Sequence, residues 1–240
     1  MQAFISSTTL LLLLSLIAAS GAARQDEARR FLDAKLVPAE GRAARDFVPR
    51  GWKLEGDDEG QVVGDLNRDA APDAVLRLVE DVPAEASDGT YNTRYRALVI
   101  LLAKPGGGYR RAAVASRLLG CTLCAGVLGD PAGGNVQLDI KNGVLNVHQL
   151  SGSREATDLT QRFRYDAGAG RFLLIGEDVE NYDRLEGGGT SVSTNYLTGV
   201  RVEKKMRATR EGHDPVVVSN KTTRVKVARR FIEDVDYDRQ

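Results

Sequence analysis

The sequence predicts a mainly-β domain of antiparallel sheets, arranged as a sandwich or a partial propeller, with a short N-terminal helix. Three observations support this prediction. From Trp52 onward, short β-type runs alternate with Gly, Asn, Asp and Pro. Asn142-Gly143 stands between two alternating runs, and this is the strongest short-range hairpin signal because both turn residues need a positive φ. No helical pattern of the kind that connects parallel strands lies between the runs.

The first segment of the chain has the pattern of a secretory signal peptide. Residues 10–19 are apolar except for Ser15, and small residues follow up to Ala23. A run this short does not span a bilayer as a helix, which takes about 20 residues. No Lys or Arg precedes the run, but the apolar stretch and its small-residue flank fit a signal peptide over residues 1–23. We therefore expect a periplasmic or secreted protein, and no later segment is apolar enough to cross a membrane.

Residues 24–47 form the predicted N-terminal helical segment. Within Arg24–Leu36, Ala28, Phe31 and Leu32 lie at helical spacing, and Pro38 ends the pattern. The remaining residues, 48–240, are predicted to form a single mainly-β domain.

The β-type runs follow one another closely along this domain. They cover residues 73–79, 97–102, 109–115, 136–140, 144–150, 163–165, 172–175, 190–197, 199–206, 216–218 and 223–227. The run at 97–102 is continuously apolar, which indicates a central strand that is buried on both faces. Short turns between neighbouring runs predict antiparallel pairing.

The composition is that of a folded protein with an uneven charge distribution. The 240 residues include 33 Lys+Arg and 33 Asp+Glu, so no overall charge attracts nucleic acid. Residues 46–90 hold 12 acidic and 4 basic side chains, whereas residues 201–230 hold 10 basic and 3 acidic ones. In the basic stretch, Val225 and Val227 alternate with charged residues, which is typical of a half-buried strand with a solvated face. Because aromatic residues are not interleaved there, no nucleic-acid partner is predicted.

The clearest motif is an acidic loop that leads into an apolar run. Its candidate ligands are Asp65, Asn67, Asp69, the carbonyl of Ala71, and Asp73, at loop positions 1, 3, 5, 7 and 9. Ca²⁺ prefers about six to eight oxygen ligands of these types. A helix–loop–helix calcium hand needs Glu at position 12, where this chain has Leu76, and the following residues are strand-like. A β-loop calcium site remains, beside the alternative of an acidic turn held by its own side-chain hydrogen bonds.

This acidic loop resembles the calcium loop of FG-GAP/VCBS-type repeats, which occur in integrin-like propellers and many exported bacterial proteins. The wider pattern, in residues 48–52, 98–102, 121–124, 129–131 and 194–199, resembles exported bacterial proteins that carry a single such loop. The resemblance implies Ca²⁺ as the bound ion. Two features depart from it, since Ala70 replaces the usual Gly at position 6 and the FG-GAP residues themselves are not visible. With one acidic loop and no internal repeat, a full propeller is not expected.

Cys121 and Cys124 are the only cysteines of the chain. A thiol oxidoreductase needs such a pair at a helix N-terminus, and the Gly-rich residues that follow are a poor helix. A zinc site needs about four ligands, and only His148 and His213 are available to complete one. We therefore prefer a small structural disulfide, as expected in an exported protein.

No catalytic group or organic cofactor is predicted. His148 lies in an alternating run and His213 in a turn, and neither has a nucleophile near it in sequence. Ser153 lacks the Gly that follows the serine of a nucleophile elbow. The sequence thus predicts an exported calcium-binding β-domain with a binding or structural role and an unidentified protein or glycan partner. The alternative is a periplasmic or secreted hydrolase with residues scattered in sequence, which a pocket around His148 or His213 would favour.

Overall fold

The computed structural model describes residues 31–56, 60–130, 134–209 and 215–239. The predicted signal peptide, residues 1–23, lies outside the described residues, as do residues 24–30 of the predicted helix and His213. Within the described ranges, no helix is long and apolar enough to cross a membrane.

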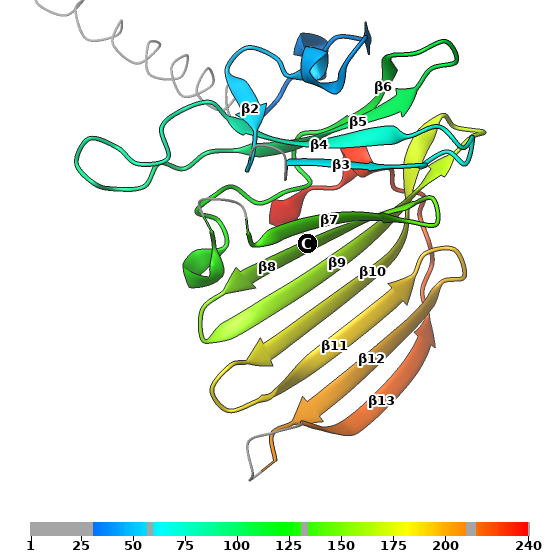
Figure 1. Cartoon of the computed structure of the whole chain (residues 1–240). Coiled ribbons are helices and arrows are strands. Elements are labelled where there is room, and N and C mark those ends of the chain that lie inside the picture. The colour runs from blue at the N-terminus through cyan, green and yellow to red at the C-terminus, as the bar shows by residue number, and fades with distance from the viewer. Residues whose placement is uncertain (1–30, 57–59, 131–133, 210–214, 240) are drawn as a thin grey trace, which may run out of the picture. The chain divides into compact units, whose positions relative to one another are not determined.

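The described strands form two antiparallel sheets, and the mainly-β prediction is confirmed. The first sheet has the order β1 (Glu40–Gly41), β6 (Tyr109–Ala115), β5 (Arg96–Ala103), β4 (Asp73–Glu80) and β2 (Trp52–Leu54), with β3 (Gln61–Gly64) also paired to β4. The second sheet follows chain order through β7 (Val136–Lys141), β8 (Val144–Gly152), β9 (Glu155–Asp166), β10 (Arg171–Asp183), β11 (Gly188–Asn195), β12 (Val200–Arg207) and β13 (Val216–Arg224). Figure 1 shows this second sheet as a curved meander.

The Asn-Gly turn forms the hairpin that the sequence predicts. Asn142 has φ 54° and Gly143 has φ 73°, and they connect β7 to β8. Further along the chain, the runs predicted at 216–218 and 223–227 are not separate strands. Residues 216–224 form the single strand β13, and residues 225–230 have no strand structure.

The predicted N-terminal helix is wrong for the part that the structure describes. Only 3₁₀ turns occur there, η1 (Ala34–Leu36) and η2 (Ala44–Phe47). Asp33 Oδ1 accepts a hydrogen bond from Lys35 N, which starts the turn η1 locally. Val37 is extended because a residue before proline avoids helical geometry, so the turn ends at once.

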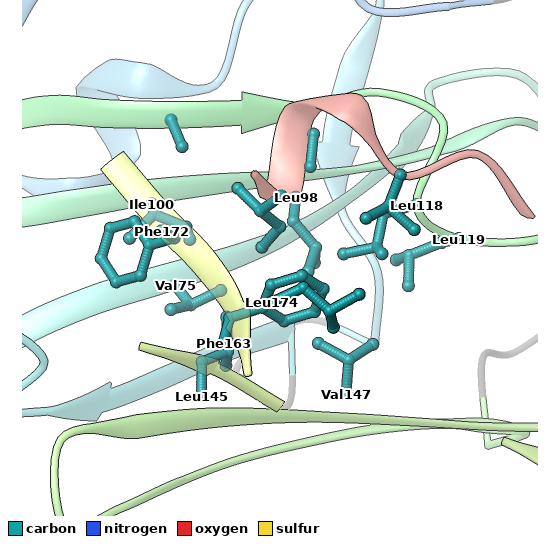
Figure 2. Close-up of a cluster of buried hydrophobic side chains, with 14 of the residues drawn as sticks. Val75, Leu98, Ile100, Leu118, Leu119, Leu145, Val147, Phe163, Phe172 and Leu174 are labelled. Atoms are coloured by element: carbon teal, nitrogen blue, oxygen red, sulfur yellow. The ribbon is translucent and has the colours of Figure 1, made fainter. Parts of the chain in front are cut away.

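Both faces of the central strands β4 and β5 are buried, as the apolar run at 97–102 predicts. On one face, the second sheet contributes Leu145, Val147, Phe163 and Phe172 to a shared core (Figure 2). The turn η5 (Ile232–Asp234), near the C-terminus, adds Ile232 to the same cluster. The first sheet and the β7–β10 part of the second sheet thus share one hydrophobic core.

The opposite face of the first sheet has its own hydrophobic cluster. Its buried residues from the N-terminal part of the chain are Leu32, Val37 and Phe47. They pack against Leu76 and Val99 of β4 and β5. This covering layer explains why these two strands are apolar at nearly every position instead of alternating.

Candidate functional site

The acidic loop is the connection between β3 and β4. Gly64 and Asp73 are the last paired residues before the loop, and residues 65–72 connect them. Leu66 points into the shared core and is almost fully buried. The loop therefore has an apolar anchor, while the side chains at its tip are exposed.

The carboxylate of Asp65 organises the turn through three backbone hydrogen bonds. Its Oδ1 accepts from Arg68 N at 2.6 Å and from Asp69 N at 3.1 Å. Its Oδ2 accepts from Ala70 N at 2.9 Å. The chain is thus wrapped around the side chain at loop position 1.

Asp73, at position 9, closes the loop from inside the protein. It is fully buried, with Oδ2 accepting from Leu66 N at 2.8 Å and Oδ1 from Ala103 N at 2.8 Å. Burial raises the pKa of Asp73, and the hydrogen bonds from Ala103, Leu66 and Asn67 oppose that shift. Asp73 therefore joins the acidic loop to the end of β5.

Asp69 and Asn67, at positions 5 and 3, are bonded to each other at the surface. Asn67 Nδ2 donates to Asp69 Oδ2 at 2.8 Å, and Asn67 Oδ1 accepts from Asp69 N at 3.1 Å. Ala71 N donates to Asp69 Oδ1 at 2.8 Å. The hydrogen bonds from Ala71 and Asn67 lower the pKa of Asp69, which keeps this carboxylate ionised.

Ala70 occupies the loop position that usually requires glycine. Its φ is 66°, in the left-handed region, and Arg68 has the same value. A residue with a Cβ atom adopts this region at a cost of roughly 1–2 kcal/mol. The loop backbone thus has the left-handed conformation at position 6 even though the sequence departs from the motif there.

The acidic side chains of the loop bond mainly to the loop itself. Among the described residues, no group of three or more His, Cys, Asp or Glu side chains is arranged to hold a metal. The carboxylates are instead bonded to the loop's own N–H groups, as in a turn held by Asx-type bonds. An ionised carboxylate has about four acceptor positions. Asp65 uses three and Asp69 two, so acceptor positions remain at the surface.

The acidic loop also contacts the second sheet. Arg68 Nη2 donates to Asn142 O at 3.0 Å, at the turn between β7 and β8. A Cβ atom at Gly64 would lie 2.8 Å from Ile140 Cγ2, so glycine allows β3 to approach β7 closely. A hollow of about 400 Å³ lies between Asp65 and the β7–β8 turn. The loop thus contacts both sheets.

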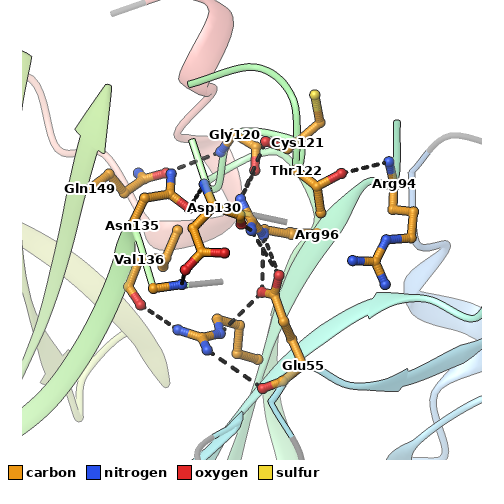
Figure 3. A network of polar contacts seen from close by, with 12 residues as sticks. Glu55, Arg94, Arg96, Gly120, Cys121, Thr122, Asp130, Asn135, Val136 and Gln149 are labelled. Atoms are coloured by element: carbon orange, nitrogen blue, oxygen red, sulfur yellow. Dashed lines mark hydrogen bonds and ion pairs between the residues drawn. The ribbon is translucent and has the colours of Figure 1, made fainter. Parts of the chain in front are cut away.

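A second polar cluster, which sequence reasoning missed, is buried beside the cysteine pair. Glu55 forms ion pairs with Arg96 at 2.7 Å and with Arg77 at 3.1 Å (Figure 3). The Glu55 and Arg96 side chains are only 2% and 0% exposed. We call these three residues the Glu55 cluster. The sequence holds one signal for such a buried ion pair. Arg77 is a charged residue inside an apolar strand pattern, and charged residues are almost never fully buried unless they are paired.

The Glu55 cluster joins three parts of the fold. Arg96 Nη1 donates to the carbonyl oxygens of Gly120 and Cys121, each at 3.2 Å. Arg77 Nη1 donates to Val136 O, at the start of β7. The two arginines thus attach the first sheet to the cysteine segment and to the second sheet.

The sulfur atoms of Cys121 and Cys124 lie at disulfide distance, with Cα atoms 4.9 Å apart. In the described residues that follow, up to Asp130, the one helical element is the 3₁₀ turn η4 (Gly126–Leu128). The pair is therefore not at the start of an α-helix, which is the setting that lowers the thiol pKa in oxidoreductases.

His148 is paired with an acidic residue on the neighbouring strand. Its Nε2 lies 2.8 Å from Asp158 Oδ1. The other ring nitrogen, Nδ1, is buried and has no hydrogen-bond partner among the described residues. A histidine and a carboxylate are thus adjacent, but within the described ranges no nucleophile is hydrogen-bonded to this histidine, so a hydrolytic triad is not formed there.

Comparisons with models of known families, with curated protein sequences and with solved structures found no match to this chain.

Proposed function

We propose that the protein is an exported, calcium-binding β-domain protein with a binding or structural role, and that Ca²⁺ binds at the acidic loop. The observation that carries the proposal is the position of the loop between the two sheets. Asp73 ties it to β5 through Ala103 N, and Arg68 ties it to the turn at Asn142. An ion bound there would stiffen a loop that both sheets contact and that a protein or glycan partner could reach.

The loop chemistry supports Ca²⁺ as the ion. Asp65 and Asp69 retain acceptor positions at the surface, and the Asn67 amide and the Ala71 carbonyl are oxygen donors of the kind Ca²⁺ accepts. Three carboxylates within one short loop repel one another, and a cation relieves that repulsion. The left-handed backbone at Ala70 is the conformation that the glycine of such loops supplies.

Export is supported by the apolar pattern of residues 1–23. The cysteine pair at disulfide distance agrees with it, because disulfides persist in oxidising compartments.

Thermal unfolding with and without calcium tests the proposal. An ion at a hundredfold excess over its Kd stabilises the native state by about 2.7 kcal/mol. For a chain of this size, that corresponds to a Tm increase of about 5–10 °C. Millimolar Ca²⁺ should produce this increase, chelation should reverse it, and Mg²⁺ should do less because it holds its waters.

The variants decide whether the effect belongs to the loop. Asp69→Ala should abolish the calcium response, because it removes one of the proposed ligands. Asp69 is exposed, so its loss leaves the core intact. Asp73→Ala is a poorer test, since it would leave buried N–H groups without their hydrogen-bond acceptor whether or not an ion binds. Asp81→Ala, an exposed carboxylate outside the loop, is the matched control and should respond like wild type. Equal melting of wild type with and without calcium would reject the proposal.

A further inference from the structure

A polar groove lies on the second sheet, away from the acidic loop. On the core-facing side of β9 and β10, the apolar pair Leu159–Val179 gives way to the polar pair Thr157–Asn181. A hollow of about 600 Å³ covers these positions. A second hollow of about 670 Å³ shares Thr157 and Asn181 with the first and reaches the start of β11 and the end of β12. Together they form an elongated groove that crosses the strands.

The polar side chains at one end of the groove are held in place by one another. Glu177 Oε2 accepts from Gln161 Nε2 at 2.8 Å, and Glu177 Oε1 accepts from Tyr196 Oη at 3.0 Å. Arg230 Nη2 donates to Tyr196 Oη at 3.0 Å, and its guanidinium lies 5.2 Å from the Tyr196 ring centre. A carboxylate and a guanidinium are thus fixed side by side, 3.8 Å apart.

The middle of the groove combines an apolar floor with hydroxyl and amide groups. Leu159 and Val179 provide the floor. Thr157 Oγ1 donates to Asn181 Oδ1 at 2.8 Å, so this bond leaves the Asn181 Nδ2 amide group to donate to a ligand. Arg239 also lines the groove, and its guanidinium lies 3.6 Å from Asp236, a carboxylate that it shares with Arg117. The second hollow adds Glu155, Asp183, Glu186 and Arg207, and Arg154 pairs with both Asp183 and Glu186. The lining therefore combines hydrogen-bond donors and acceptors with charges of both signs, so it does not select a ligand of one charge.

We propose that this groove binds a linear, uncharged oligosaccharide. A sugar ring presents an apolar C–H face, which fits Leu159, Val179 and the Tyr196 ring. Its neighbouring hydroxyl groups both donate and accept, which matches a carboxylate beside a guanidinium. The elongated shape accommodates several rings in a row. An extended peptide fits less well, because the strand N–H and C=O groups beneath the groove are already paired in the sheet.

The test is isothermal titration calorimetry of the full protein with cellotetraose, maltotetraose and xylotetraose. At least one should bind wild type. Glu177→Gln and Asn181→Ala should each weaken that binding at least tenfold. Ser193→Ala is the matched control: it lies in the adjacent strand and bonds Asp178, a residue that lines neither hollow, so binding should not change. The melting temperature of each variant shows whether it remains folded.

The other outcomes count against the proposal. No binding by any of the three sugars, or equal binding by wild type and both groove variants, would overturn it. Binding of a mixed extended peptide pool without sugar binding would assign the groove to peptides, and binding of tetragalacturonate alone would assign it to an anionic ligand. All titrations are run in chelator and again in millimolar Ca²⁺. Because the groove shares no residue with the acidic loop, the sugar result stands apart from the calcium result.

Discussion

Replacing Glu55 with Gln should strongly destabilise the protein. Glu55 is the carboxylate between Arg77 and Arg96, and all three side chains are buried. Gln keeps one acceptor oxygen but removes the negative charge, so two guanidinium groups lose the charge that compensates them. The carbonyl groups that Arg96 also contacts carry only partial charge and do not replace it.

The size of the effect follows from burial. Removing one partner of a buried ion pair costs about 3–5 kcal/mol. In a chain of this size each kcal/mol shifts the Tm by about 2–4 °C, so Glu55→Gln should lower it by roughly 6–20 °C. Calorimetry and urea unfolding, each compared with wild type, measure the change.

The matched control is an exposed ion pair in the same sheet. Lys53 and Asp81 lie 3.0 Å apart, with side chains 47% and 56% exposed. Asp81→Asn should cost less than about 1 kcal/mol, because solvent screens such pairs. If Glu55→Gln melts within about 2 °C of wild type, as the control should, the reasoning about buried charge in this cluster is refuted.

Three further changes have defined outcomes. Ala70→Gly should stabilise the protein by about 0.5–1 kcal/mol in urea unfolding, because glycine relieves the left-handed strain but loses more entropy on folding. Ala71→Gly relieves no such strain and should destabilise the protein. If both variants change the free energy of unfolding in the same direction, the argument is contradicted. Joint replacement of Cys121 and Cys124 by Ser should leave a folded protein that is about 2 kcal/mol less stable, and free thiols in the native protein would rule out the bond. Burial tends to raise the pKa of Asp178, but hydrogen bonds to its carboxylate outweigh burial and hold the pKa below its usual value. The ionised Asp178 therefore stabilises the folded protein above about pH 4, and this contribution is lost as the pH falls through the lower native pKa. Asp178→Asn should flatten the stability–pH curve in that window, and equal slopes would disprove this.

Local signals in the sequence predict most of the sheet structure. The run at 109–115 coincides with β6, and the Asn-Gly pair marks the β7–β8 turn, because both features depend on neighbouring residues alone. The apolar run at 97–102 indicates its burial directly. The stripe that includes Leu32 failed as a helix signal where the structure describes it, because Leu32 packs against the first sheet from a segment without a helix.

The candidate sites also differ in whether their residues are neighbours in the sequence. The acidic loop is contiguous in sequence, so its residues could be named in advance, although the burial of Asp73 could not. The Glu55 cluster and the groove depend on residues that distant strands bring together. Arg96 and Glu55 are 41 positions apart, and Glu177 and Arg230 meet only because the C-terminal segment returns to the sheet. Periodicity reports which side of a strand is buried but not which strand covers it.

The most direct test of the central claim is to count bound calcium. Equilibrium dialysis of the purified protein against millimolar Ca²⁺, followed by elemental analysis, gives the number of ions per chain. The account predicts one bound calcium ion per chain for wild type and for Asp81→Ala, and none for Asp69→Ala. A wild-type protein that retains no more calcium than Asp69→Ala would contradict the account and leave the loop as an acidic turn held by its own hydrogen bonds.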